Sequence, residues 1–286
     1  MDFERETQVT ALVGTAPRER SALGPANYEA QLSKDWEIWG PNGGYLCAIA
    51  LRAAGHEAQI KRPIALYCHY LKVAQFAAVQ LRVELLGRTR RSESFRVSMH
   101  QDGKPILEAM IRTAAAGDGL AHVDVTAPLV PPPEDLPDAR SLITSEHGKR
   151  HAFWNNFDVR VIRKERFALP RAPSSPQWVE WFRVHCEAGF ADPFVDAGRS
   201  ALLLDTMGWP AAVGPHPNSA FLAPSLDFAA WFHAASPDND FVLIDAHSAI
   251  ARDGCISATG RVFDRKGTLL ASSGTQLLCT PMPKPA

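Results

Sequence analysis

This chain contains an internal repeat, which leaves few folds open to it. Four predicted β-strands in the first half return in the same order in the second half, separated by polar turns. Pro63 and Pro224 begin the first strand of each set at an offset of 161 residues, and Asp102 and Asp264 mark a later turn at an offset of 162. A nearly constant offset indicates a duplicated structural unit. The predicted strands span 62–72, 79–87, 94–103 and 105–115 in the first half, and 223–233, 241–250, 255–267 and 268–278 in the second.

Each half also contains a helix with almost no polar face. Residues 44–54 (GYLCAIALRAA) and 200–212 (SALLLDTMGWPAA) are predicted helices, and the first begins at the paired glycines Gly43 and Gly44. A helix that lies on a sheet keeps a polar stripe for water, so these two must be enclosed on most sides. Strands adjacent in sequence are expected to pair antiparallel, which makes each half a helix followed by an antiparallel meander. The sequence predicts an α+β protein with two antiparallel sheets, each wrapped around a central helix.

A proline-rich connector divides the two halves. Residues 117–137 (GDGLAHVDVTAPLVPPPEDLP) are rich in Pro, Gly and Asp and show no sustained period, so we expect an extended segment outside any core. The predicted division is an N-terminal unit of residues 1–118, a linker of residues 119–148 and a C-terminal unit of residues 149–286.

The charge balance and the cysteine content indicate which partners and which cell compartment to expect. The 30 Lys and Arg residues are balanced by 31 Asp and Glu, so neither nucleic acid nor an anionic membrane is expected as a partner. The 5 cysteines are odd in number and form no CxxC pattern, which indicates reduced thiols. The start MDFERE does not read as a signal peptide, and no stretch approaches the roughly 20 apolar residues of a membrane span. We expect a cytoplasmic protein.

Five stretches, taken together and in order, carry a family resemblance. They are WEIWGPNGGYLCAIALRAA, IALYCHYLK and GRTRRSESFRVSMHQDGKPI in the first half, and APSLDFAAWFH and LLASSGTQLL in the second. Together they resemble the acyl-CoA thioesterase II family, whose fold is the double hotdog. The likeness covers nearly the whole chain from about Tyr28 onward. It implies a thioester hydrolase of lipid metabolism that acts on an acyl-CoA and needs no cofactor.

The resemblance also implies a catalytic site. In the family an Asp on the second helix, a Thr or Ser in the next strand and a Gln in the last strand hold the hydrolytic water. These positions fall on Asp205, Ser225 and Gln276. The Asp is implied to activate the water for direct attack on the thioester, without a covalent intermediate. The segment ASSGTQ carries one extra residue relative to the family pattern, so Thr275 is the alternative to Gln276.

Asp205 is also unusual by its own surroundings. A carboxylate among apolar groups has a raised pKa and is a better base, provided that hydrogen bonds keep it ionised. The alternative is that Asp205 turns toward a helix end or toward water. Its neighbours three and four positions away along the helix, none of them charged, are Ala201, Leu202, Gly208 and Trp209.

Comparison of the repeats singles out three strand positions that are polar only in the second half. Buried polar groups reduce stability unless they are hydrogen-bonded, so we expect these three to form one network rather than to face solvent. Period-2 alternation places Ser225 and Asp227 on the same strand face. At the offsets of 161 and 162, the pairs are Ser225 with Ile64, Asp227 with Leu66, and Gln276 with Ala114.

The glycines before the first helix have a candidate role. Backbone amides at a helix N-terminus are unpaired and carry a partial positive charge, which suits a developing oxyanion. We therefore expect Asn42, Gly43 and Gly44 to bind the thioester carbonyl, because glycine lets a ligand approach the backbone closely. The candidates for contact with the CoA phosphates are Arg88, Arg90 and Arg91 of GRTRR, with Lys61 and Arg62 nearby.

Other interpretations stay open. Asp227 is a rival carboxylate and His233 a rival base, although we expect both to be structural or rim residues. His147 and His151 in HGKRH have the spacing of a metal pair but lie among Lys149 and Arg150, so we expect a basic turn and no metal. A non-catalytic acyl-CoA or acyl-lipid binding protein and an enoyl-thioester hydratase are the alternative functions. Association into a homodimer or homotetramer is not settled by the sequence.

Overall fold

The computed structural model describes residues 2–12, 25–145 and 150–282. The first half contains α1 (Phe3–Glu6), β1 (Thr10–Ala11), β2 (Ala26–Gln31), η1 (Lys34–Trp36), α2 (Gly43–Glu57), β3 (Pro63–Tyr70), β4 (Ala78–Arg88), β5 (Ser92–Gln101) and β6 (Lys104–Ala114). The rest contains the short 3-10 helices η2 (Pro133–Asp135), η3 (Ala139–Leu142), η5 (Ala152–Asn156) and η6 (Lys164–Phe167), with β7 (Phe157–Arg160), β8 (Gln177–Val184), α3 (Pro193–Val213), β9 (Phe221–Leu222), β10 (Ser225–Phe232), β11 (Val242–Arg252), β12 (Cys255–Phe263), β13 (Leu269–Leu278) and β14 (Thr280–Pro281).

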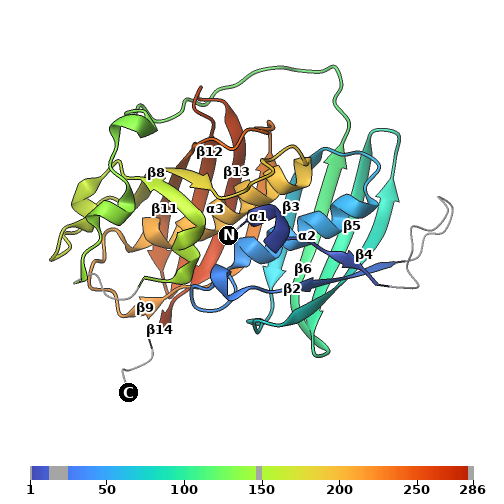
Figure 1. Cartoon of the computed structure of the whole chain (residues 1–286), viewed down its shortest axis with the longest axis horizontal. Helices are drawn as coiled ribbons and strands as arrows, with labels where there is room; N and C mark the ends of the chain where they lie inside the picture. Colours follow the sequence, from blue (N-terminus) through green and yellow to red (C-terminus); the bar gives the residue numbers. More distant parts are fainter. Residues whose placement is uncertain (1, 13–24, 146–149, 283–286) are drawn as a thin grey trace.

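Most of these strands form one continuous sheet built from two similar halves. Its order is β1-β2-β4-β5-β6-β3-β10-β13-β12-β11-β8-β7, so the second half repeats the first in reverse. Strands β3 and β10 join the halves as an antiparallel pair, with Tyr67 opposite Ala229. The sheet passes behind α2 and α3, which lie side by side at the centre of the molecule (Figure 1). The predicted α+β double hotdog is confirmed, and its two sheets are continuous with each other.

Two details of the predicted strand arrangement are wrong. Strand β3 pairs with β6 and β10 pairs with β13, whereas the meander would have paired each with the strand that follows it in sequence. The connection after β3 instead crosses its half-sheet to β4. A strand also precedes each helix, β2 before α2 and β8 before α3, and sequence analysis overlooked both because it took each half to begin with its helix.

Helices α2 and α3 pack against each other in opposite directions. Gly44 of α2 lies against Leu202 of α3, and Gly198 of α3 lies against Ala48 of α2. A Cβ atom on Gly44 would lie 2.6 Å from the Leu202 Cα atom and 2.9 Å from the Ala201 carbonyl oxygen. The helix backbones therefore approach more closely than any side chain at residue 44 would allow. This contact is one reason for the paired glycines.

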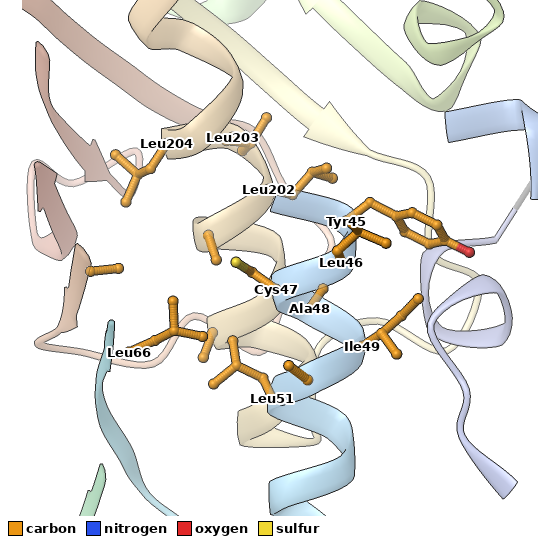
Figure 2. Close-up of a cluster of buried hydrophobic side chains, with 14 of the residues drawn as sticks. Tyr45, Leu46, Cys47, Ala48, Ile49, Leu51, Leu66, Leu202, Leu203 and Leu204 are labelled. Atoms are coloured by element: carbon orange, nitrogen blue, oxygen red, sulfur yellow. The ribbon is translucent and has the colours of Figure 1, made fainter. Parts of the chain in front are cut away.

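The two helices are buried along nearly their whole lengths, as predicted. Figure 2 shows Leu66 of β3 on the sheet side of the helix pair, while Tyr45 and Ile49 of α2 point to the opposite side. Helix α3 begins at Pro193, earlier than predicted, because Asp192 caps it by accepting a hydrogen bond from the Phe194 amide at 2.8 Å. Within the described residues, no helix is long and apolar enough to cross a lipid bilayer.

The connector between the halves covers the outer face of the second half-sheet. It runs along the top of the view in Figure 1, from β6 to η2. The Trp181 side chain of β8 donates a hydrogen bond to the Pro131 carbonyl at 3.0 Å, and Val125, Ala127 and Val130 pack in the small apolar cluster around Trp181. The expectation of a segment outside any core is wrong, because these apolar side chains close a core of their own.

Candidate active site

A pocket of about 330 Å³ opens at the end of the helix pair where α2 begins. Its walls come from the loop before α2, the chain after β3, the second half of α3 and the first residue of β10. Much of the lining is apolar, including the rings of Trp39 and Trp209, which meet edge to face at 6.0 Å. Asp205 lines this pocket together with Ser225 and Gly43. The pocket therefore joins residues from both halves of the chain.

Asp205 is a buried carboxylate that accepts several hydrogen bonds. Its residue is 6% exposed, and the Tyr70 hydroxyl donates to its Oδ1 atom at 3.2 Å. The Ser225 hydroxyl and the Gly44 amide also donate to this carboxylate. Burial raises the pKa of Asp205 to about 6, while the three hydrogen bonds oppose that rise. The group is thus ionised at neutral pH and still accepts a proton more readily than an exposed Asp.

A β-bulge places Ser225 in this pocket. Between Ser225 and Asp227, strand β10 has one residue more than its partner β13, so that Ser225 lies opposite Leu277 and Asp227 lies opposite Gln276. Residues paired across two strands share a face of the sheet. Leu277 is buried and Gln276 is exposed, so Ser225 and Asp227 lie on opposite faces. The expected alternation, which placed them together, is wrong because of the bulge.

Gln276 does not reach the pocket. Its side-chain amide donates to the Ser257 hydroxyl at 2.8 Å on the outer face of the sheet, and its backbone amide donates to Asp227 Oδ1 at 3.1 Å. The predicted network of Ser225, Asp227 and Gln276 is therefore not formed. The position of Gln276 beside Asp205 is wrong, because the extra residue in ASSGTQ turns the Gln outward.

Thr275 takes the inward position instead. It is 6% exposed, its hydroxyl donates to the Asp227 carbonyl at 2.7 Å, and its methyl group lies next to Gly208 of α3. This is the alternative that the extra residue left open in the sequence. Thr275 packs one helical turn away from Asp205, and its hydroxyl is occupied by the strand backbone.

Strand pairing also corrects the comparison of the two halves. Strand β3 has a bulge between Pro63 and Ala65, at the place where β10 has its own. The offset of 161 fails because the connections between strands differ in length in the two halves. Aligned on the bulges, the equivalent pairs are Ser225 with Pro63, Asp227 with Ala65, Tyr70 with Phe232, Thr275 with Ile111, and Gln276 with Arg112.

The start of α2 lies at the pocket, as expected, but its polar groups have different partners. Asn42 caps the helix: its Oδ1 accepts from the Tyr45 amide at 3.0 Å, and its Nδ2 donates to the Thr206 hydroxyl at 3.1 Å. The Gly44 amide donates to Asp205. The Gly43 amide has no acceptor in the part of the chain that the structure describes. Of the three predicted carbonyl-binding residues, Gly43 alone keeps a free amide.

Tyr70 is a polar residue beside Asp205 that sequence analysis missed. It ends β3, and its hydroxyl contacts both Asp205 Oδ1 and the Cys47 sulfur, the latter at 3.2 Å. Leu66 and Cys68 share the inward face of β3 with Tyr70. Alternation along IALYCHYLK is the signal that singles it out, because it turns one of the two tyrosines toward the helices and leaves the other exposed.

Two models of one family match this chain. Residues 32–114 match the acyl-CoA thioesterase N-terminal domain, and residues 131–279 match the acyl-CoA thioesterase C-terminal domain. The chain belongs to the acyl-CoA thioesterase family. It is accordingly a thioester hydrolase. Human acyl-coenzyme A thioesterase 8 is 26% identical over 246 residues, which cover 79% of this chain and 76% of the human protein.

Solved structures support the fold of this thioesterase. A protein with a hot dog fold from Alicyclobacillus acidocaldarius matches with a TM-score of 0.79 at 19% identity and covers 98% of each chain. An acyl-CoA thioesterase II from Mycobacterium marinum matches with a TM-score of 0.75 at 21% identity and covers 99% of each chain. The whole double hotdog is therefore shared, including the position of the helix pair.

The arginines of GRTRR lie far from the pocket of the thioesterase. The Arg88 Nε atom pairs with Glu93 at 2.6 Å, and the buried Glu93 accepts from the Ile60 amide, just after α2, at 2.8 Å. This hairpin therefore stands at the C-terminal end of α2, about 20 Å from the pocket at its N-terminal end. Arg88 is committed to this ion pair. Contact of Arg90 and Arg91 with the CoA phosphates stays a prediction.

The rival groups also lie apart from the pocket of the thioesterase. Asp227 is on the outer face of the sheet, and His233 lies 2.9 Å from the Ser272 hydroxyl on the surface. Within the described residues, no histidine lines the pocket and no group of three His, Cys, Asp or Glu could hold a metal. His147 of the HGKRH segment lies outside the described residues.

Proposed function

We propose that this thioesterase hydrolyses an acyl-CoA by direct attack of a water molecule that Asp205 activates. The observation that carries the proposal is the setting of Asp205, a buried carboxylate with a pKa of about 6 that faces a largely apolar pocket. A general base works best when its pKa lies near the working pH. The substrate class, an acyl-CoA, is proposed from the acyl-CoA thioesterase family to which the chain belongs.

In the proposed reaction, Asp205 takes one proton from the water as the water oxygen bonds to the thioester carbon. The resulting tetrahedral intermediate collapses, the carbon–sulfur bond breaks, and the CoA thiolate receives the proton that Asp205 holds. Tyr70, Ser225 and the Gly44 amide hold the carboxylate in place by donating to it. Their role is to fix the direction of proton transfer, which is the geometric requirement of general base catalysis.

The oxyanion of the intermediate is proposed to lie at the N-terminus of α2. The Gly43 amide has no acceptor among the described residues and lines the same pocket as Asp205. The first turn of a helix carries a partial positive charge, which stabilises a developing negative charge nearby. Glycine at this position keeps the space beside Asp205 open, because a Cβ atom would lie 2.8 Å from Asp205 Oδ2.

The proposal is tested by the release of free thiol from a panel of acyl-CoAs. Asp205→Asn is expected to lower kcat by about 100-fold or more, because it keeps the shape of the side chain and removes the base. Asp227→Asn is the matched control, since that carboxylate lies on the outer face of the sheet. If Asp205→Asn keeps full activity, Asp205 is not the base. If the wild type binds CoA esters and hydrolyses none, the chain is a binding protein and the enzymatic proposal is wrong.

Four broader expectations stay proposals. The five cysteines are all free thiols, which favours a reducing compartment such as the cytoplasm. A role in lipid metabolism is favoured by the acyl-CoA thioesterase family of the chain. A linker that begins after residue 118 is supported by the absence of helix and strand in the described segment between β6 and η2, and the boundary at residue 148 lies outside the described residues. Assembly into a homodimer or homotetramer is checked by light scattering coupled to size exclusion.

A further inference from the structure

A second pocket, of about 260 Å³, lies beside the active-site pocket. Both pockets are lined by Trp154 and Pro210, so these two side chains form the wall between them. The second pocket lies between the end of α3, strand β8 and the short 3-10 helices that precede β8. We call it the arginine pocket because Arg150, Arg166 and Arg171 line it.

Several buried polar atoms around the arginine pocket have no partner. Among the described residues, the Arg166 Nε atom and the Trp178 Nε1 atom are buried without a hydrogen bond, and both residues line the pocket. Glu180 Oε1 is unpaired as well, and Glu180 is only 1% exposed. It lies on β8 between Trp178 and Phe182 and shares their face, which is the face that lines the pocket. Unpaired buried polar atoms are rare, and a cluster of them marks a place for a polar ligand or ordered water.

The charges around the arginine pocket favour an anion. None of its three guanidinium groups forms an ion pair with a carboxylate of the described residues. Arg150 and Arg166 donate instead to backbone carbonyls, and Arg166 also lies over the Trp178 ring at 4.9 Å. The opposing carboxylate is Glu180, and burial raises its pKa to about 7. Guanidinium groups bind carboxylates well because their paired donors match the two oxygens.

The remaining walls of the arginine pocket suit a hydrocarbon chain. Ile143, Val159, Phe167 and Phe182 line it together with the two tryptophans. The transfer of methylene groups from water into such a space is favourable, whereas the transfer of a hydrated diphosphate is unfavourable. To enter it, an acyl chain whose thioester lies at Asp205 would have to pass the wall of Trp154 and Pro210.

We propose that the arginine pocket receives the far end of the acyl chain and that the preferred acyl chain ends there in a carboxylate group. The substrate class is then an acyl-CoA with a second carboxylate at the end of the chain. The inference rests on the proposed function, because it assumes that the thioester is hydrolysed at Asp205. It adds the means by which one acyl group is selected over another.

The test compares matched pairs of substrates over a series of chain lengths. Each pair is a plain acyl-CoA and the acyl-CoA of equal length that ends in a carboxylate. At the chain length that reaches the arginine pocket, we expect kcat/KM to favour the carboxylate member by at least about tenfold. Equal kcat/KM values for both members at every length would overturn the inference. If the wild type hydrolyses neither class, the proposed function itself fails.

Two variants test whether the arginines bind the carboxylate at the end of the acyl chain. Arg171→Met removes an exposed guanidinium that has no hydrogen bond among the described residues, so the fold should be unaffected. Arg166→Met removes the half-buried one. Both are expected to abolish the preference for the carboxylate member and to leave kcat/KM of the plain acyl-CoA within about twofold. Arg112→Met, on the exposed outer face of β6, is the matched control and should keep the preference.

Inhibition by free CoA shows which end of the substrate the arginine pocket binds. If the arginine pocket binds the acyl end, Arg171→Met and Arg166→Met leave the inhibition constant of CoA unchanged. If both variants weaken CoA inhibition and slow both substrate classes equally, the pocket binds the phosphates of CoA and the inference is wrong.

Discussion

The two ends of the α2–α3 helix pair are equivalent in the internal repeat and opposite in polarity. At the pocket end, a hydroxyl-bearing side chain stands at each of three inward strand positions, and at the other end an apolar side chain replaces it. The pairs are Tyr70 and Phe232, Ser225 and Pro63, and Thr275 and Ile111. Strand bulges fall at the same place at both ends, so the backbone alone does not make the difference.

The apolar end shows what stability requires of this fold. There the Phe194 ring of α3 packs against Gly55 of α2, so closely that a Cβ on Gly55 would lie 2.7 Å from the ring. A helix pair closed by apolar contacts needs no buried hydroxyl, and burying polar groups reduces stability unless they are paired. The hydroxyls of Tyr70 and Ser225 are therefore best explained by the carboxylate to which they donate, Asp205, whereas that of Thr275 donates to the strand backbone.

The sharpest test of this difference is at the two neighbouring glycines. Gly43→Ala should lower kcat/KM by about 100-fold, because its Cβ would lie 2.8 Å from Asp205 Oδ2 and from the Tyr70 hydroxyl, and a displacement near the reacting groups has effects of that size. Thermal unfolding should change little, since both contacts are side-chain ends. Steady-state kinetics and calorimetry measure the two quantities.

Gly44→Ala is the matched control, with the opposite expectation. Its Cβ would meet the Leu202 backbone at 2.6 Å, so the helices must separate and the fold should lose about 1–3 kcal/mol. A Gly44→Val protein with unchanged stability would contradict the close helix contact. If Gly43→Ala and Gly44→Ala changed stability and turnover equally, Gly43 would not act on the reacting groups separately from the packing role of Gly44.

Ser225→Ala should have the next largest effect. It removes a hydrogen bond to the Asp205 carboxylate, and hydrogen bonds to charged groups contribute about 1.5–3 kcal/mol, which corresponds to a decrease in kcat of about tenfold to 100-fold. Thr275→Ala provides the comparison, since the Thr275 hydroxyl donates to a backbone carbonyl. If Ser225→Ala retains wild-type kcat, the bulge that presents Ser225 has no part in the chemistry.

Tyr70→Phe introduces the residue found at the equivalent position of the apolar end. The fold should tolerate it, and kcat should fall by less than about tenfold, because two other donors still hold Asp205. A hydrogen bond to a carboxylate lowers its pKa, so its loss should raise the pKa of Asp205 and move the acidic limb of the pH–rate profile to higher pH. A shift to lower pH, or none, would argue against the Tyr70 contact.

The smallest effect is expected at Gln276. Gln276→Ala should change kcat/KM by less than about twofold, because its amide bonds to Ser257 on the outer face and not to Asp205. A loss comparable to that of Ser225→Ala would place Gln276 in the pocket after all and would contradict the register of β13.

The sequence was sufficient for the fold because its signals are long and repeated. Two apolar helices and eight strands at nearly constant spacing favour one architecture, and both helices and all eight strands are present. The order of β3 and β4 was wrong, since pairing neighbours in sequence is only a tendency. The strands β2 and β8 were missed because each half was taken to begin with its helix.

The pocket was predicted in part, and the error at Gln276 has a plain physical origin. The family resemblance singled out Asp205 and Ser225, and the structure brings both to one pocket. Gln276 was misplaced because side chains alternate with a period of two, so a single extra residue moves a side chain to the other face. Neither a bulge nor a loop length is visible in a comparison made at a fixed offset. Tyr70 was missed because the comparison of the two halves singled out only positions that are polar in the second half, and Tyr70 lies in the first.

The central claim is that Asp205 acts as the base at the polar end of the helix pair. The most direct measurement is the dependence of kcat/KM on pH for the wild type and Asp205→Asn. Because the base must be ionised, the wild-type rate should fall about tenfold per pH unit below about pH 6 and stay level above it, and the residual rate of the variant should lack this break. A wild-type profile that is flat through pH 6, or a break that persists in Asp205→Asn, would contradict the account.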